Sequence, residues 1–369
     1  MGAQPKILHI VVAGQIGGAE RLLADLAIRK GSGANHAIAL MSPNPGLAAL
    51  FADHGIPLHD RGRVHENPLA YLWRSYGPAD LAWLSKVINA EKPDLLHCHT
   101  YGSHVLAVRA AKQSGLPLIR SEHGVRHYRD PTCALNRHWA LKNTTRIIAV
   151  SGFVAHKIAE IEPAVTDRIT VVHNGIDLDR FAPMPPRTDG PFTLAAVARL
   201  EPVKRLDIAL AALKEVPEVR LEIAGDGADR AKLEKLSGAL GLTERVRFHG
   251  QLADPRPVFA AADAVVNCTK QEAFSLSVLE TGAMQRPMIA IADGGTPEAV
   301  VEGRTGWLTP EASVPAFAAL IRQAAADRAE AARRGTEARA WVTARFGIET
   351  MCEAYGAVYR SLVRGENHG

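Results

Sequence analysis

The chain contains few aromatic residues, 5% of 369, and no long apolar run. Its longest apolar stretches, such as Ile7 to Ala13, are far shorter than the roughly 20 residues that cross a bilayer. The N-terminus lacks a charged segment followed by an apolar one, so we expect no secretory signal. These absences favour a cytoplasmic protein without membrane spans.

Cysteine is also scarce, with four residues and no C-x-x-C pair. This spacing excludes a zinc knuckle and a disulfide scaffold, and it predicts reduced thiols. No H-E-x-x-H segment suggests a catalytic zinc site, and no G-x-S-x-G elbow suggests a serine hydrolase. We therefore expect no metal and no bound cofactor.

Composition indicates a globular protein with more than one domain. Hydrophobic residues make up 47% and charged residues 22% of the chain, which excludes disordered, collagenous and coiled-coil proteins. At 369 residues the chain exceeds the size at which a single core keeps growing, so two domains are expected.

Short apolar strands alternate with helical patterns along most of the chain. Such alternation predicts the α/β class, with a parallel sheet covered on both faces. A proline-rich stretch from Pro183 to Pro191 interrupts the alternation, which restarts at Phe192. We expect two Rossmann-like doubly wound domains facing across a cleft, with boundaries at residues 1–183 and 184–345. Residues 346–369 are expected to form a helix that packs back on the first domain.

The first strand ends in a glycine loop, Gly14-Gln15-Ile16-Gly17-Gly18, which leads into a helix. Glycines let backbone N–H groups approach an anion at a helix N-terminus. The spacing is neither G-x-G-x-x-G nor a P-loop, so it indicates neither dinucleotide binding nor phosphoryl transfer. A tight strand-to-helix turn without a ligand remains the alternative.

Two cations, Arg199 and Lys204, follow the first strand of the second half. Cations near a helix N-terminus are unfavourable to the helix dipole, and an anionic ligand such as a diphosphate would relieve them. Solvated surface charges are the alternative interpretation.

The most informative segment runs from Glu272 to Glu280 and places two carboxylates around a turn that opens a helix. Backbone N–H groups near Ser275 and Leu276 are suited to phosphate, whereas the carboxylates are suited to accept hydrogen bonds from sugar or ribose hydroxyls. The alternative is a first-turn dipole partner at Glu272 and a solvated helix residue at Glu280.

Taken in order, these motifs resemble a retaining glycosyltransferase of the GT-B fold, family 4 (glycosyl transferases group 1), over nearly the whole chain. The pair of acids straddles seven residues, as it does in that family, although the family's glycine after the first acid is Ala273 here. The resemblance rests on Gly17-Gly18, Ser121-Glu122-His123-Gly124, His173-Asn174-Gly175-Ile176-Asp177, Arg199 with Lys204, and Glu272 with Glu280.

The resemblance implies roles for residues of the second domain. Arg199 and Lys204 would hold the donor diphosphate, Glu280 would bond the ribose, and Glu272 would bond hydroxyls of the transferred sugar. Loop amides for the phosphate would come from Phe274, Ser275 and Leu276.

In the first domain the resemblance implies that Gly17 and Gly18 bring backbone against the sugar phosphate. His123 corresponds to the histidine that faces the reacting sugar. The implied catalytic set is therefore His123, Glu272, Arg199 and Lys204, with a nucleotide-diphosphate sugar as co-substrate.

Histidines and basic residues are concentrated in the first half. His97 and His99, with His123 nearby, suggest a metal site, but a further carboxylate or spaced ligand is missing. Residues 104–146 hold eight Lys or Arg against two acids. This excess, including Arg126 and Arg129, suits a phosphorylated or lipid-linked acceptor or the anionic inner face of a membrane, and a solvated face is the alternative. No motif for nucleic acid accompanies it.

The sequence thus predicts a metal-independent retaining hexosyltransferase that acts on a lipid-linked or saccharide acceptor, in envelope polysaccharide or glycoconjugate assembly. The alternatives are a non-catalytic nucleotide-sugar binding protein and an epimerase or phosphorylase-like enzyme of the same fold.

Overall fold

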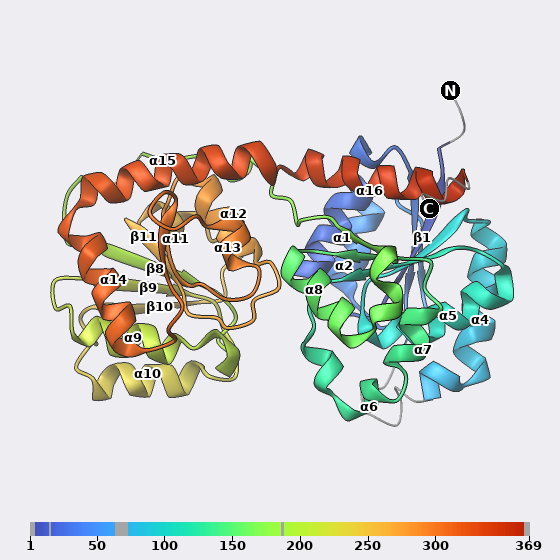
Figure 1. Ribbon diagram of the computed structural model, residues 1–369, viewed down its shortest axis with the longest axis horizontal. Coiled ribbons are helices and arrows are strands. Elements are labelled where there is room, and N and C mark those ends of the chain that lie inside the picture. Colours follow the sequence, from blue (N-terminus) through green and yellow to red (C-terminus); the bar gives the residue numbers. More distant parts are fainter. Residues whose placement is uncertain (1–3, 15, 63–72, 186–187, 365–369) are drawn as a thin grey trace. The chain divides into compact units, whose positions relative to one another are not determined.

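The chain forms two α/β units in a computed structural model that describes residues 4–14, 16–62, 73–185 and 188–364 (Figure 1). Unit 1 contains the chain up to Gly175 together with the chain from Ile348 onward, and unit 2 contains Ile176–Gly347. Each unit has one all-parallel sheet with helices around it, as the alternation of strands and helices predicted.

Unit 1 contains a seven-stranded sheet in the order β3-β2-β1-β4-β5-β6-β7. The strands are β1 Lys6–Val11, β2 Asn35–Leu40, β3 Leu58–Asp60, β4 Leu95–Cys98, β5 Leu118–Glu122, β6 Arg146–Ala149 and β7 Ile169–Val171. The helices are α1 Gly18–Ile28, α2 Pro45–Asp53, α4 Pro78–Glu91, α5 Tyr101–Ser114, α6 Pro131–Ala134, α7 Arg137–Lys142, α8 Gly152–Ile161 and α16 Ile348–Val363, with short 3-10 helices η1 Lys30–Ser32, η2 Arg126–Arg129 and η3 Pro163–Arg168.

Strand alternation separates the two faces of this sheet. Leu8 and Ile10 pack with residues of α4 and α5 on one face, whereas Val11 packs with residues of α1 and α2 on the other. His9 therefore shares the face of Val11. Because His9 and His97 are register partners on β1 and β4, both imidazoles lie on that face.

Unit 2 contains a six-stranded sheet in the order β10-β9-β8-β11-β12-β13. The strands are β8 Thr193–Val197, β9 Arg220–Ala224, β10 Val246–Gly250, β11 Ala264–Asn267, β12 Met288–Ile291 and β13 Gly306–Thr309. The helices are α9 Leu206–Lys214, α10 Arg230–Ala239, α11 Arg256–Ala260, α12 Leu276–Ala283, α13 Thr296–Ala299, α14 Val314–Ala326 and α15 Arg328–Arg345, with 3-10 helix η4 Pro202–Lys204.

The unit boundaries lie at residues 175/176 and 347/348, whereas the sequence predicted boundaries at 183/184 and 345/346. The N–H of Ile176 donates to the carbonyl of Phe346 at 2.8 Å, and Arg339 donates to the carbonyl of Phe181 at 3.0 Å. These bonds attach residues 176–181 to the end of α15, so the chain enters unit 2 before the proline-rich stretch.

Helix α16 belongs to unit 1 although it follows unit 2 in the chain. Tyr359 and Tyr355 on this helix contact His97 and Ser121 of the sheet, at 2.9 and 3.0 Å. In the part of the chain that the structure describes, no helix combines the length and the apolar character that a bilayer crossing requires. The four cysteines are all free and buried.

Candidate functional site

Strand order marks one crevice in unit 2. From β8 the chain runs outward through β9 and β10, then crosses to β11 on the other side of β8, so the topological switch point lies between β8 and β11. Ligands of doubly wound sheets bind at the carboxyl ends of the strands at such a point. A small pocket at this place includes Ala198, Lys204, Asn267, Thr269 and Ser277 in its lining.

Two of the predicted site residues contact each other across this switch point. Lys204 follows β8 and Glu272 follows β11, and the Lys204 Nζ lies 2.6 Å from Glu272 Oε2. Their side chains are 18% and 15% exposed, so the pair is largely shielded from solvent. Arg199, in the same loop as Lys204, pairs instead with Glu201 and keeps 71% of its side chain exposed. Lys204 is thus held in a shielded contact, whereas Arg199 is held in an exposed ion pair that a ligand has to replace.

Glycines of the neighbouring loop fix the backbone around Arg199. A Cβ on Gly225 would lie 1.9 Å from the carbonyl oxygen of Ala198, and one on Gly227 would lie 2.4 Å from that of Leu200. Both glycines have positive φ, at 137° and 156°. Glycine is therefore required at each position, since only glycine allows this close approach of two backbones.

A third glycine supports the Glu272 loop. Gly294, with φ of 67°, would place a Cβ 2.2 Å from the carbonyl oxygen of Glu272, and the N–H of Gly295 donates to that oxygen at 2.7 Å. Gln271 has a left-handed φ of 53°, a conformation that is costly for a side-chain-bearing residue and that accumulates at functional sites. Ala273 is not among the residues with positive φ, so glycine is not required there.

Helix α12 begins directly after this loop. Its N-cap, Ser275, makes no side-chain capping bond and instead contacts Ser277, Oγ to Oγ, at 2.9 Å. The first N–H groups of a helix have no intrahelical acceptor, so the amides at Leu276 and Ser277 suit an anion. Glu280 lies in the same helix and is 6% exposed. The Phe274 ring packs edge-on against Phe346 within unit 2, at 5.3 Å between centroids.

In unit 1 the predicted glycines form the N-terminus of α1. Gly17 is the N-cap of this helix and Gly18 its first residue. The N–H of Gly17 donates to Glu20 Oε2 at 2.8 Å, so a carboxylate of the same helix occupies this amide. An anion that binds here has to displace Glu20.

His123 follows β5 at the carboxyl edge of the unit 1 sheet. It is half-buried, yet both of its ring nitrogens are buried and have no hydrogen-bond partner among the described residues. Burial, followed by the charge of Arg120, lowers the pKa of His123 to about 4, so the imidazole is neutral at pH 7. A neutral ring with unused nitrogens suits hydroxyl groups better than it suits an anion.

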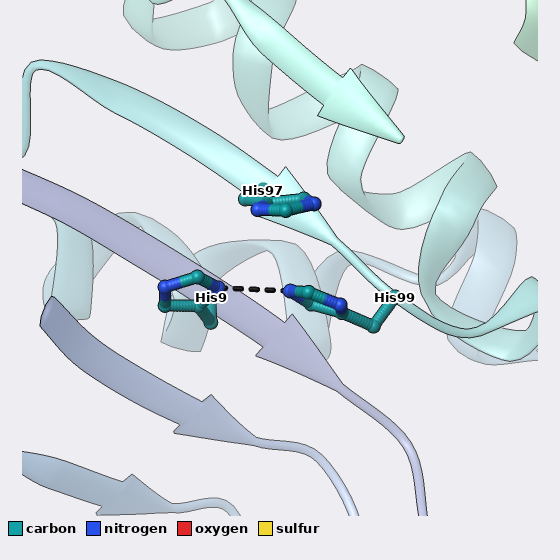
Figure 2. A group of neighbouring side chains, drawn as sticks. All are labelled: His9, His97 and His99. Atoms are coloured by element: carbon teal, nitrogen blue, oxygen red, sulfur yellow. Dashed lines mark hydrogen bonds between the residues drawn. The ribbon is translucent and has the colours of Figure 1, made fainter. Parts of the chain in front are cut away.

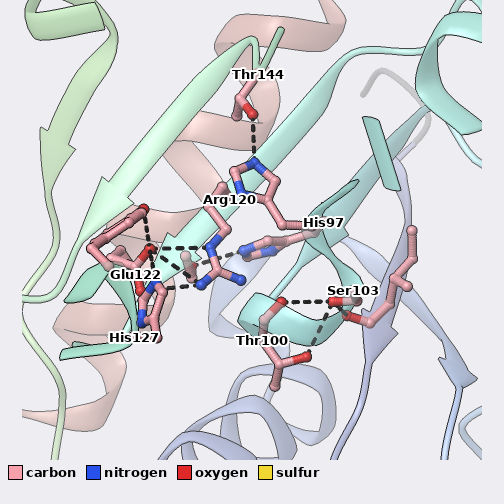
Figure 3. Close-up of polar contacts among 11 residues, drawn as sticks. His97, Thr100, Ser103, Arg120, Glu122, His127 and Thr144 are labelled. Atoms are coloured by element: carbon pink, nitrogen blue, oxygen red, sulfur yellow. Dashed lines mark hydrogen bonds and ion pairs between the residues drawn. The ribbon is translucent and has the colours of Figure 1, made fainter. Parts of the chain in front are cut away.

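A buried ion pair that the sequence did not predict lies on β5, which ends just before His123 (Figure 3). Arg120 Nη2 is 3.1 Å from Glu122 Oε1, both side chains are 1% exposed, and Tyr128 donates to Glu122 Oε2 at 2.7 Å. Burial opposes ionisation of Glu122, but Arg120, His127 and Tyr128 together outweigh it, and the pKa of Glu122 is lowered. The pair fixes the end of β5 and so the position of His123. Arg126 and Arg129 lie in η2, and both are exposed.

Histidines also gather beneath the switch point of unit 1 (Figure 2). One nitrogen from each of His9, His97 and His99 lies within 4.8 Å of the others, and all three rings are buried. The His97 and His99 rings are tilted against each other, with centroids 3.9 Å apart and planes at 34°. Both nitrogens of His9 and of His97 are already hydrogen bonded.

Two family models together match most of the chain. Residues 16–180 match Glycosyltransferase Family 4, and residues 180–341 match Glycosyl transferases group 1. A glycogen synthase of Mycobacterium tuberculosis is 32% identical over 292 residues, which cover 74% of this chain and 70% of that protein. The chain belongs to the family 4, group 1 glycosyltransferases. A D-inositol 3-phosphate glycosyltransferase of Streptomyces scabiei is 30% identical, over 73% of this chain and 68% of that protein.

Solved structures of glycosyltransferases share the fold. HepE of Anabaena, solved in complex with UDP, superimposes with a TM-score of 0.85 at 23% identity, over 97% of this chain and all of that chain. The sucrose-phosphate synthase of Thermosynechococcus elongatus gives a TM-score of 0.83 at 21% identity, over 98% of this chain and 100% of that chain. The GT-B fold that the sequence predicted is thus confirmed.

Proposed function

We propose that this family 4 glycosyltransferase is a retaining, metal-independent enzyme that moves a hexose from a nucleoside diphosphate donor to an acceptor hydroxyl. The observation that carries the proposal is the contact of Lys204 with Glu272 across the switch point of unit 2, next to the N-terminus of α12. A cation, helix amides and a carboxylate meet there, and a nucleotide sugar presents a diphosphate and hydroxyls at matching positions.

Lys204, Arg199 and the amides at the start of α12 would stabilise the charge that develops on the departing diphosphate. Preorganised donors of this kind lower a barrier by about 3 kcal/mol each. Glu272 would accept hydrogen bonds from hydroxyls of the transferred sugar, while Glu280 would bond the ribose. Retention is then explained by acceptor attack from the leaving-group side, with a phosphate oxygen taking the acceptor proton.

We propose uridine donors first, because HepE, which shares the fold, was solved with UDP and with UDP-glucose. For the acceptor we propose a saccharide or polyol, free or lipid-linked, in envelope polysaccharide or glycoconjugate synthesis. The relatives named glycogen synthase and D-inositol 3-phosphate glycosyltransferase support this class. The exposed Arg126 and Arg129 would face a lipid-linked acceptor at the cytoplasmic side of a membrane.

The test is transfer from α-linked UDP-hexoses to a panel of saccharides and inositols, in excess chelator, with product configuration read by NMR. We expect UDP release that depends on the acceptor and an α-linked product, because the protein supplies the positive charge itself. A β-linked product would reject retention, and activity that needs added magnesium or manganese would reject metal independence. Saturable donor binding without UDP release would favour a binding protein.

A further inference from the structure

A chain of hydrogen-bonded side chains crosses the α16 face of the unit 1 sheet. Ser32 Oγ lies 2.9 Å from His36 Nε2, His36 Nδ1 lies 2.8 Å from His9 Nε2, and His9 Nδ1 lies 2.8 Å from His99 Nε2. All four residues are buried, at 6% exposure or less. The chain ends at His99 Nδ1, which is buried and has no partner among the described residues.

Each imidazole in this chain is neutral. Burial lowers the pKa of His36 to about 4, and burial, followed by the neighbouring histidines, lowers the pKa of His9 and of His99 well below the usual value. A neutral imidazole has one N–H donor and one acceptor nitrogen. The donor nitrogen of one ring therefore decides the tautomer of the next ring. As a result, all hydrogen bonds of the series must run in the same direction.

Ser32 decides this direction. The N–H of Ala34 donates to Ser32 Oγ at 3.3 Å, and in the described part of the chain His36 Nε2 is the acceptor within reach of the Ser32 hydroxyl proton. If His36 donated to Ser32 instead, that buried proton would have no acceptor. An unsatisfied buried donor costs about 1 to 3 kcal/mol. Ser32 therefore donates to His36, His36 to His9 and His9 to His99, each ring through Nδ1–H.

The last ring then carries its proton on Nδ1, where the described residues offer no acceptor. His99 directly follows β4, and β1 and β4 flank the switch point of the unit 1 sheet, where ligands of such sheets bind. The His99 ring is stacked with the His123 ring, at 5.9 Å between centroids. Within the part of the chain that the structure describes, both nitrogens of His123 also have no hydrogen-bond partner. Three buried ring nitrogens at one sheet edge indicate a missing polar ligand.

We propose that His99 is the ligand-facing end of the directional chain Ser32–His36–His9–His99, which holds its Nδ1 as a proton donor to a hydroxyl oxygen of a sugar or polyol. The ligand class follows from neutrality, because a neutral N–H beside a neutral imidazole matches a hydroxyl rather than a phosphate. As a deepening of the proposed function, this assigns Ser32, His36 and His9 as positioning residues of the unit 1 subsite.

The test is nitrogen NMR of the full chain with ring-labelled histidine, which reads each tautomer directly and needs no enzymatic activity. Resonances are assigned with single His→Gln variants. We expect His36, His9 and His99 to be neutral and protonated on Nδ1 at pH 7. A His99 protonated on Nε2, or charged, would overturn the proposal.

Ser32→Ala tests the origin of the direction, and Ser121→Ala is the matched control. Both remove a buried hydroxyl that lies 2.8 to 2.9 Å from an imidazole, but Ser121 contacts His97, which is outside the chain. We expect Ser32→Ala to give mixed tautomers at His99 and Ser121→Ala to leave that ring unchanged. An unchanged His99 in folded Ser32→Ala would contradict the assignment.

The ligand is tested by adding D-glucose, myo-inositol or inorganic phosphate and following the His99 Nδ1 resonance. We expect a saturable shift with glucose or inositol and none with phosphate, and about tenfold weaker binding in Ser32→Ala. If only phosphate shifts the His99 resonance, or if none of the three compounds shifts it, the proposed subsite is rejected. Because the probes contain no nucleotide, failure here is distinct from failure of donor use at unit 2.

Discussion

At the scale of single residues, Glu272 and Glu280 differ in their surroundings, and we predict that their variants fail differently. Glu280 is a buried residue of α12. The ribose is not part of the bond that breaks, so a hydrogen bond from Glu280 to the ribose would change little during reaction. Glu280→Gln should weaken the affinity for donor and for free UDP alike, while turnover at saturation falls less. Titration calorimetry with UDP and steady-state kinetics measure the two effects.

Glu272→Gln should leave UDP affinity almost intact and lower turnover at least tenfold, a loss of about 1.4 kcal/mol per tenfold. The amide still accepts from Lys204, whose charge stays available to the diphosphate, but it no longer responds to positive charge at the anomeric carbon. Equal loss of UDP affinity in both variants, with turnover spared, would contradict this division of roles.

Residue types and spacing singled out Lys204 and Glu272, which the structure brings together, but did not predict their contact. The separation of the two acids, and Lys204 after a strand, could be read from the sequence. That Lys204 contacts Glu272 while Arg199 pairs with Glu201 depends on loop geometry that periodicity does not encode. The pair Arg120 and Glu122 was missed because alternating charged residues in a strand usually indicate an exposed face.

At the scale of elements, we predict that Gly294 is required for the Glu272 loop. Gly294→Ala would place a methyl group 2.2 Å from the Glu272 carbonyl oxygen, so the loop must move and turnover should fall at least tenfold. The matched control is Gly303→Ala, which has a similar φ of 71° against 67° but nothing within 4 Å of its Cβ.

Both variants bear the cost of a left-handed alanine, about 1 kcal/mol. Only Gly294→Ala adds the clash, so it should lower the free energy of unfolding further and reduce turnover, whereas Gly303→Ala should retain activity. Urea unfolding and kinetics on the pair give the comparison. Equal activity in both variants would remove the assigned role of Gly294.

The alternation of short strands and helical patterns predicted the α/β class and the restart at Phe192, just before β8 begins at Thr193. It did not locate the segment with β2, α2, β3 and α4. The short β3 is only partly buried, and half-buried strands of three residues lack a clear pattern. The signal for Gly294 was present as Asp-Gly-Gly after a strand, which often indicates a positive φ.

At the scale of the whole molecule, histidine is distributed unevenly, and we predict that unit 1 is the acid-sensitive part. Unit 2 contains one histidine, His249, of the 15 in the chain. Unit 1 contains the buried neutral ones, such as His36 with its pKa lowered to about 4 and His104 to about 3. Burial is the first cause in both cases.

A pKa below the unfolded value of about 6.5 means that the unfolded chain binds protons first. This stability is present above pH 6.5 and is lost as pH falls toward 4, by about 2 kcal/mol at pH 5 for a group such as His36. In calorimetric scans from pH 7.5 to 5, one thermal unfolding transition should move to lower temperature. Hydrogen exchange should assign that transition to unit 1. An equal loss of stability in both units on acidification would contradict the prediction.

The central claim is that the carboxyl edge of the unit 2 sheet, at Lys204, binds the diphosphate of a nucleotide sugar without metal. The most direct measurement is titration of UDP, in chelator, into wild-type protein, Lys204→Ala and Lys214→Ala, whose lysine lies exposed at the end of α9. We predict one site per chain, binding weakened about 10- to 100-fold by Lys204→Ala and unchanged by Lys214→Ala. Wild-type affinity in folded Lys204→Ala would contradict the account.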